Sequence, residues 1–268
     1  MIMIQISASR TRNFALTLLL MLAASTTLFA QNHRHSHGDV GRNQAPSYGV
    51  SFLDQGEKVP DALLFLPAPP AFDSSAFTAD SIGYVEAKKL RDTERGEQAI
   101  DDAKTSIKYY MKRFSPAVGL ELNPEDYPEL ATMMKGVAQD VRGSIQNAKH
   151  TYARQRPYQH FHEGTPIPED ECEDDFTSYP SGHTVRGWAL AMLLSNVFPE
   201  HASEIMKVGY EIGYSRVIVG FHYLSDVENA RYAASAGYTY LCSKEAFQQA
   251  LKSCRAEAQT AELLACQQ

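Results

Sequence analysis

Apolar side chains recur every three to four residues over most of the chain, which is the period of helices that bury one face. No stretch of useful length alternates apolar and polar residues as a half-buried strand does. The pattern therefore predicts an all-α fold, a single-domain helical bundle. The predicted helices, in chain order, span 81–90, 94–114, a segment that ends at 156, a segment that starts at 182, about 202–213 and about 226–241, followed by a helix-prone tail to 268.

The helix that ends at 156 has two possible starts. Asn123-Pro124 is one, because Asn caps a helix and Pro suits its first position. Pro128, four residues later, is the other. Pro157 ends the helix, since the residue before a proline is steered away from the helical conformation.

The N-terminus has the features of a secretory signal peptide. Arg10 and Arg12 precede an apolar run over 14–24, and small residues follow up to Ala30. The run is shorter than the roughly 20 apolar residues that a membrane span needs, which favours cleavage after Ala30 over a retained anchor. Residues 1–30 are therefore predicted to direct export to the periplasm. Later apolar runs are too short to span, so no stable membrane association is expected.

The mature chain divides into three predicted parts. Residues 31–58 are polar and are expected to form a flexible lead-in, 59–245 the folded domain, and 246–268 a helical C-terminal tail. The lead-in contains three alternating histidines that could bind a metal weakly but more often belong to a solvated linker. These are His33, His35 and His37.

Composition excludes several classes of protein. The chain has 268 residues, 44% apolar and 21% charged, with 16 Gly and 13 Pro, which is ordinary globular usage. Its formal net charge is −7, so the chain lacks the excess of basic residues that is typical of a nucleic-acid-binding protein. Small molecules are therefore better candidate partners than nucleic acid, and association of identical chains stays open.

The four cysteines fit an exported protein. Their number is even, and no pair has the C-x-x-C spacing of a zinc or redox site. Disulfides are favoured in an oxidising compartment, and four cysteines allow three connectivities, among which the spacing does not choose. The residues are Cys172, Cys242, Cys254 and Cys266.

Two motifs have the chemistry of an anion site. Lys149 and Arg156 are seven residues apart on a predicted helix, so both project from one face, whereas Arg154 points elsewhere. Ser181-Gly182-His183 follows Pro180 at a helix start, where free backbone N–H groups, a hydroxyl and the helix dipole suit a phosphate. Taken singly, the first motif is more often a solvated basic face and the second an ordinary helix cap.

The third motif adds a histidine with a carboxylate. The planar guanidinium of Arg216 can donate paired hydrogen bonds to phosphate oxygens. His222 lies just before the helix over about 226–241, and Asp226 in its first turn can orient the imidazole. Ser225 and Glu228 have the spacing of a capping box for that helix. Together, the three motifs predict phosphoryl transfer to a histidine.

The same motifs resemble a family signature. Lys-x6-Arg-Pro, Pro-Ser-Gly-His and Ser-Arg-x5-His-x3-Asp are similar to those of the PAP2 acid phosphatase and vanadium haloperoxidase superfamily. Further similarity to the bacterial class A non-specific acid phosphatases covers most of 60–245. One departure is Thr177, which stands where that class usually has Gly before Ser-Tyr-Pro-Ser-Gly-His-Thr. The lead-in, 159–175 and the cysteine-bearing tail are not explained by the resemblance.

The resemblance implies a bundle of the PAP2 acid phosphatase type and a role for each site residue. His222 would be the nucleophile that forms a phosphohistidine, Asp226 would orient it, and His183 would protonate the leaving alcohol and then activate water. The expected phosphate-binding residues are Lys149, Arg156, Ser181, Gly182 and Arg216. No metal or other cofactor is implied, because protein cations take the place of Mg²⁺.

The predicted activity is a broad-specificity acid phosphatase acting on small phosphomonoesters, with transfer to another alcohol left open. A neutral His222 beside a protonated His183 fits a mildly acidic optimum, given the ordinary histidine pKa of about 6.5. Three alternatives are a vanadium-dependent haloperoxidase, a lipid or polyprenyl phosphatase, and a phosphate-binding protein without activity. The pairing of His222 with Asp226 argues against the last.

Overall fold

The structure is a computed structural model that describes residues 50–265. The predicted signal peptide, the histidines of 33–37 and Cys266 lie outside these residues. Within them the chain forms α-helices and short 3-10 turns and no strand, which confirms the predicted all-α class. None of the helices in 50–265 is both long enough and apolar enough to cross a membrane.

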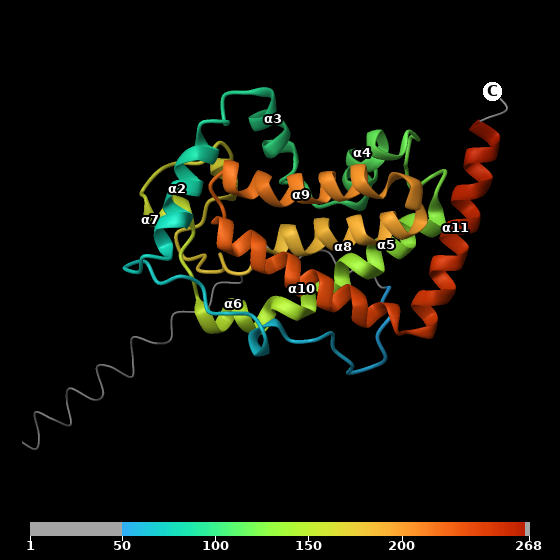
Figure 1. Ribbon diagram of the computed structural model, residues 1–268, viewed down its shortest axis with the longest axis horizontal. Helices are drawn as coiled ribbons and strands as arrows, with labels where there is room; N and C mark the ends of the chain where they lie inside the picture. Colours follow the sequence, from blue (N-terminus) through green and yellow to red (C-terminus); the bar gives the residue numbers. More distant parts are fainter. Residues whose placement is uncertain (1–49, 266–268) are drawn as a thin grey trace, which may run out of the picture. The chain divides into compact units, whose positions relative to one another are not determined.

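The helices are drawn in Figure 1. Their bounds are α2 Phe77–Lys88, α3 Glu94–Asp101, α4 Ile107–Val118, α5 Pro128–Asp140, α6 Gln146–Tyr152, α7 Pro157–His160, α8 Gly182–Val197, α9 Ala202–Ile218, α10 Leu224–Cys242 and α11 Glu245–Ala265. A 3-10 turn, Val141–Ile145, joins α5 to α6.

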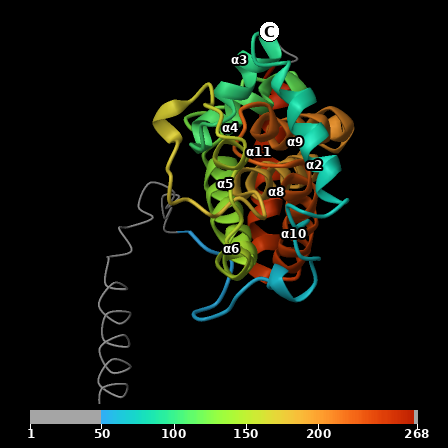
Figure 2. The ribbon, with the colours of Figure 1, turned by 90° about the vertical axis from the view of Figure 1, so that its left-hand side faces the viewer.

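Helix α8 lies at the centre of the bundle. It packs along α9 and α10, with α5 and α11 covering further sides (Figures 1 and 2). Glycine permits the close approach of α8 and α9, because a Cβ on Gly209 would lie only 2.5 Å from the Cβ of Ala191. A Cβ on Gly187 would lie 2.7 Å from Cγ2 of Ile212. This close packing sets α8 and α9 side by side over most of their length.

Three helix ends meet at one end of the bundle. The start of α8, the end of α9 and the start of α10 lie together on the left of Figure 1, next to α2, α6 and α7. The backbone links the starts of α8 and α10 directly, since the N–H of Ser181 donates to the carbonyl of Asp226 (3.1 Å). The predicted motifs therefore converge at this end.

The predicted helix over 94–114 is two helices. α3 ends at Asp101 and α4 begins at Ile107, with the Ser106 hydroxyl accepting from the N–H of Tyr109 as its cap. The break is stabilised by the buried carboxylate of Asp102, which accepts from side chains on α4 and, more than 100 positions away in sequence, on α9. Its partners are Tyr109, Arg113 and Ser215.

The predicted helix up to 156 also ends early. It begins at Pro128, the second of the two possible starts, and continues through the 3-10 turn into α6, which stops at Tyr152. Ala153 adopts the left-handed conformation, with φ 40°. Lys149 and Arg156 therefore do not share a helix face as predicted, and Arg156 is instead the N-cap residue of α7.

The start of α10 differs from the predicted capping box of Ser225 and Glu228. The helix begins at Leu224, two residues earlier than predicted, and the N–H of Tyr223 donates to Oδ2 of Asp226 (2.8 Å). Ser225 instead donates through both its N–H and its hydroxyl to Asp80 on α2. Tertiary contacts with α2 thus replace the expected local cap.

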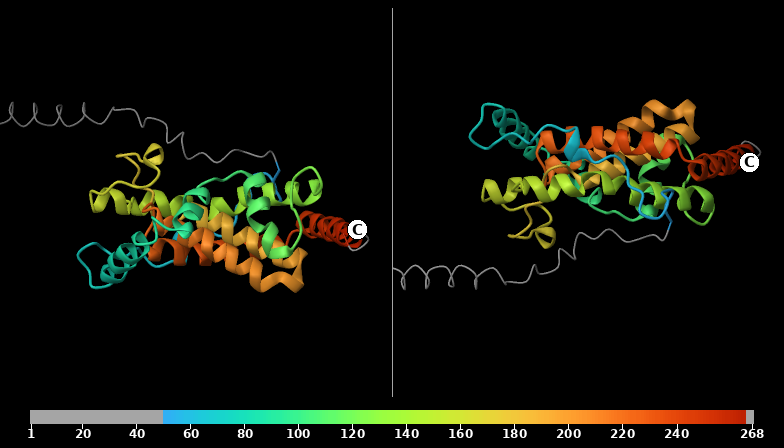
Figure 3. Two further views of the ribbon diagram at one scale, coloured as in Figure 1. Left: turned by 90° about the horizontal axis from the view of Figure 1, so that it is seen from above. Right: turned by 90° about the horizontal axis from the view of Figure 1, so that it is seen from below.

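The described part of the predicted flexible lead-in is packed. Ser51 and the N–H of Phe52 both donate to Asp140 at 2.8 Å. The ring of Phe52 meets that of Phe247 edge to face at 5.3 Å. This segment, blue in the right-hand view of Figure 3, lies near the start of α11. The rest of the predicted lead-in lies outside the described residues, and the predicted boundaries of the folded domain stay a prediction.

The disulfides expected among the described cysteines are absent. Cys172 is an exposed free thiol, Cys242 is half-buried and Cys254 is buried. The Sγ of Cys254 lies 3.5 Å from Sδ of Met133 in the core between α5 and α11. Burial raises the pKa of the Cys254 thiol to about 12, so this side chain behaves as an apolar core residue.

Candidate active site

The first turn of α8 provides an anion-binding surface. Ser181 caps the helix, and its hydroxyl oxygen accepts from both the N–H (3.3 Å) and the hydroxyl (2.9 Å) of Thr184. The hydroxyl proton of Ser181 is left to donate elsewhere. Gly182 follows, where a Cβ would lie 4.0 Å from Cε of Lys149. The helix start therefore lies close to the first predicted cation.

His222 lies in a tight turn between α9 and α10. Gly220 takes a φ of 85°, which favours glycine, and the N–H groups of Phe221 and His222 both return to the carbonyl of Arg216. The imidazole is buried, 2% exposed. Its Nδ1 lies 3.5 Å from Oδ2 of Asp226, and its Nε2 lies 3.3 Å from Nη1 of Arg156.

These two contacts assign the tautomer of His222. An arginine N–H can only donate, so Nε2 presents a lone pair to Arg156 and the proton is on Nδ1, facing the carboxylate. Burial lowers the pKa of His222 to about 3, against the opposing influence of Asp226. The site thus holds a neutral imidazole with its lone pair directed away from Asp226.

Asp226 is held ionised by groups on several elements. Burial acts to raise its pKa, but the charge of Arg154 and the contacts with His222 and Ser178 prevail and lower it. Nη1 of Arg154 donates to Oδ1 at 2.6 Å, and the hydroxyl of Ser178 donates to Oδ2 at 2.6 Å. Arg154 also pairs with Asp80 at 2.7 Å. The prediction that Arg154 points away from the site is therefore wrong.

The cations gather around the same point. Arg156 and Arg216 are buried, at 5% and 3% exposure, and each packs its guanidinium against the ring of Phe221. Nε and Nη1 of Arg216 have no hydrogen-bond partner within residues 50–265. A buried guanidinium with free donors is suited to an anion, because an unpaired buried charge is costly. Burial and the charge of Arg156 lower the pKa of Arg216 to about 10.

Lys149 completes the cluster. Its Nζ donates to the carbonyl of Thr177, the residue that departs from the class A pattern. Burial and the charge of Arg156 lower the pKa of Lys149 to about 7. The charge of this lysine is therefore sensitive to pH in the neutral range.

His183 faces the break between α3 and α4. Its Nε2 lies 3.0 Å from the carbonyl of Ala103, which can only accept, so Nε2 carries the hydrogen. Burial, followed by the charges of Arg216 and Arg186, lowers the pKa of His183 well below its ordinary value. The protonated His183 expected from the sequence is thus not the form that these surroundings favour without an anion.

The fold brings the predicted site residues together, and it adds others. Sequence reasoning missed Arg154, Asp80, Ser178, Ala103 and Asp175. Arg154 was missed because a continuous helix was expected up to 156. Ala103 was missed because no glycine or proline marks the helix break after α3. Ser178 stands inside the motif around Pro180 and could have been suspected as a partner of Asp226.

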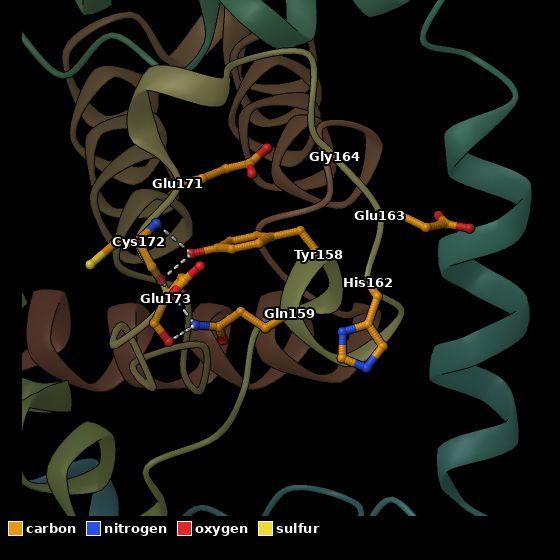
Figure 4. A pocket seen from close by; sticks show the side chains of 8 residues that line it. All are labelled: Tyr158, Gln159, His162, Glu163, Gly164, Glu171, Cys172 and Glu173. Carbon is orange, nitrogen blue, oxygen red and sulfur yellow. Dashed lines mark hydrogen bonds between the residues drawn. The ribbon is translucent and has the colours of Figure 1, made fainter.

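A separate cavity of about 590 Å³ lies beside this cluster (Figure 4). None of the predicted site residues lines it. Tyr158 connects the two, because its hydroxyl donates to the carbonyl of Cys172 (2.8 Å) on the cavity wall and its ring packs against Phe221, 5.3 Å between centroids. The cavity lining is Tyr158, Gln159, His162, Glu163, Gly164, Glu171, Cys172 and Glu173.

The chain is similar to known proteins of one superfamily. The family model of the PAP2 superfamily matches residues 130–246. A non-specific acid phosphatase of Providencia stuartii is 39% identical over 199 residues, covering 74% of this chain and 80% of that protein. A non-specific acid phosphatase of Salmonella typhimurium is 38% identical over 204 residues, covering 75% and 81%. An acid phosphatase of Zymomonas mobilis is 29% identical over 204 residues, covering 75% and 76%.

Proposed function

This chain belongs to the bacterial class A non-specific acid phosphatases of the PAP2 superfamily, and from that premise we propose that it hydrolyses phosphomonoesters through a phosphohistidine on Nε2 of His222. The observation that carries the proposal is the lone pair of Nε2, which faces the cation cluster while Nδ1 faces Asp226. A neutral imidazole so oriented is a competent nucleophile.

In the first step, the phosphoryl group lies between His222 and the cations. The free donors of Arg216, Nη1 of Arg156 and Lys149 bind its oxygens, together with the Ser181 hydroxyl and the N–H groups that start α8. Nε2 of His222 forms the new P–N bond as the bond from phosphorus to the ester oxygen breaks. These donors stabilise the charge that develops on the phosphoryl oxygens.

His183 supplies the proton in this step. Its Nε2 is engaged by Ala103, which leaves Nδ1 as the ring nitrogen for proton transfer. Burial and the neighbouring arginines lower the pKa of His183, and the negative charge of a bound phosphate dianion raises it again. The protonated form that the chemistry needs is thus produced by the substrate itself, and it protonates the leaving alcohol.

In the second step, water replaces the alcohol. The now neutral His183 accepts a proton from the water, whose oxygen bonds to phosphorus as the P–N bond breaks. Asp226 stabilises the charge that His222 carries while it is phosphorylated. If a second alcohol takes the place of water, the same step transfers the phosphoryl group instead.

Broad specificity, metal independence and export belong to the same proposal. The donors named above address the phosphoryl group rather than the alcohol, which supports a weak preference among esters. Protein cations provide the charge that Mg²⁺ supplies in other phosphoryl-transfer sites, so we expect activity to survive EDTA. Export to the periplasm rests on the sequence of residues 1–30.

Rapid mixing with p-nitrophenyl phosphate tests the roles of the two histidines. His222→Ala removes the nucleophile, so turnover should vanish for every ester. His183→Ala removes only the proton donor, and nitrophenol is a good leaving group, so a burst close to one nitrophenol per site should precede slow turnover. The exposed-surface variant His150→Ala should behave as the unaltered protein. A burst from His222→Ala with none from His183→Ala would reverse the two roles.

A further inference from the structure

The side edge of the Arg156 guanidinium is occupied by a carboxylate from this chain. Nε and Nη2 of Arg156 contact Oδ2 of Asp175 at 2.9 and 2.8 Å. The pair is nearly closed off from solvent, with the two side chains 6% and 11% exposed. Asp175 ends an acidic stretch over 169–175 that the sequence motifs leave without a role. Its neighbour Asp174 is exposed.

Thr177 extends this contact. Its hydroxyl donates to Oδ1 of Asp175 and accepts from Nη2 of Arg156 at 3.1 Å, while its N–H donates to Oδ1 at 2.9 Å. A glycine, the usual residue here in the class A pattern, has no hydroxyl to offer. The departure at this position thus adds a hydrogen bond to a phosphate-binding arginine.

The opposite side of the guanidinium faces the nucleophile. Nη1 of Arg156 donates to the carbonyl of Phe221 at 2.9 Å and lies 3.3 Å from Nε2 of His222. Asp175 and Thr177 therefore hold Nε and Nη2, and leave Nη1 directed at the place where a phosphoryl group on His222 would lie. Because a guanidinium is planar and rigid, fixing one edge fixes the other.

We propose that Asp175 and Thr177 form a clamp that positions Arg156 for the transition state and limits how tightly the site holds free phosphate. This inference rests on the proposed phosphohistidine mechanism. The clamp orients Nη1 towards the transferring oxygens, and the carboxylate offsets one of the three cations, Lys149, Arg156 and Arg216. Orientation favours the chemical step, and the partial neutralisation favours release of the product.

Asp175→Asn separates these two effects. The two oxygens of Asp175 accept from different donors, Arg156 on Oδ2 and Thr177 on Oδ1, so an asparagine must turn its NH₂ towards one of them. The clamp is then broken and its negative charge is lost. Thr177→Val removes the hydroxyl at nearly constant shape and changes no charge. Asp174→Asn is the matched control, because it removes the same charge from an exposed neighbour.

Steady-state kinetics with p-nitrophenyl phosphate, inhibition by inorganic phosphate and thermal melting give the readouts. Asp175→Asn should lower kcat about ten-fold, because a misplaced catalytic donor loses its advantage. It should also lower the Ki of phosphate about three-fold, because the cation cluster gains net positive charge. Thr177→Val should lower kcat without lowering Ki. Asp174→Asn should change both by less than about two-fold.

Each other outcome overturns the clamp. Equal behaviour of Asp175→Asn and Asp174→Asn would show that the contact has no effect. A lower Ki with unchanged kcat would make Asp175 a counter-charge only, and a lower kcat with a raised Ki and reduced Tm would make it a structural residue. These results are separable from the proposed function, which fails if His222→Ala remains active, whatever Asp175→Asn does.

Discussion

Nη1 of Arg154 lies 2.6 Å from Oδ1 of Asp226, while His222 approaches the other oxygen of the same carboxylate. Both partners are buried, and Arg154 also pairs with Asp80, so one guanidinium bridges two buried carboxylates. The ring of Tyr223 covers the guanidinium, and Cζ of Arg154 lies 4.2 Å from the centroid of that ring. The orientation of His222 therefore depends on an arginine that acts through Asp226.

Replacing Arg154 should destabilise the fold. Arg154→Met leaves Asp80 and Asp226 buried without their cation, which should lower the free energy of unfolding by about 3–5 kcal/mol. Urea denaturation measures the loss. Lys89→Met, which breaks an exposed pair with Glu86, is the control and should cost less than about 1 kcal/mol. Similar losses for the two variants would contradict a structural role of the buried pairs.

Anion affinity should fall as the pH rises through neutrality. The pKa of Lys149 is lowered to about 7, so this lysine is charged below pH 7 and loses its charge above it. Sulfate is the suitable probe, because its own charge is constant over pH 5–9, and isothermal titration gives its Kd. Lys149→Arg stays charged throughout, so it should lack the weakening near pH 7. The same weakening in Lys149→Arg would assign it to another group.

Vanadate should inhibit competitively with the phosphate ester. A five-coordinate vanadate bonded to Nε2 of His222 resembles the phosphoryl transition state, and such analogues bind far more tightly than substrate. The Ki of vanadate for the unaltered protein is compared with the Kd of vanadate for His222→Ala. The variant should lose the tight binding. Indifference of the unaltered enzyme to vanadate would count against the mechanism. Bromide oxidation with added vanadate would instead favour the haloperoxidase alternative.

The cysteines within residues 50–265 should react as free thiols. Cys172 is exposed and should react rapidly with a thiol reagent in the native protein, and Cys172→Ser should remove that rapid phase. Cys254 is buried with a raised pKa, so it should react only after unfolding. If Cys172 reacts only after reduction with dithiothreitol, it is in a disulfide and the prediction is wrong.

Local signals in the sequence determine the helices that carry the motifs. The turn before Gly182 predicts the start of α8. The helical spacing of apolar residues predicts α10 and α11 close to their observed bounds. The residue types and spacings around Lys149, His183 and His222 already indicate phosphate chemistry. These features are short-range, because a cap, a proline and a helical period depend on neighbours within a few residues.

Only the tertiary structure decides where helices break and which side chains meet there. Ala153 turns left-handed and the chain leaves its helix after Asp101, although no glycine or proline marks either point. The first break directs Arg154 to Asp226, and the second frees the carbonyl of Ala103 for His183. Buried ion pairs and hydrogen bonds between residues more than 70 positions apart stabilise both breaks. Such contacts form only when the bundle has brought distant segments together, so no local pattern contains them.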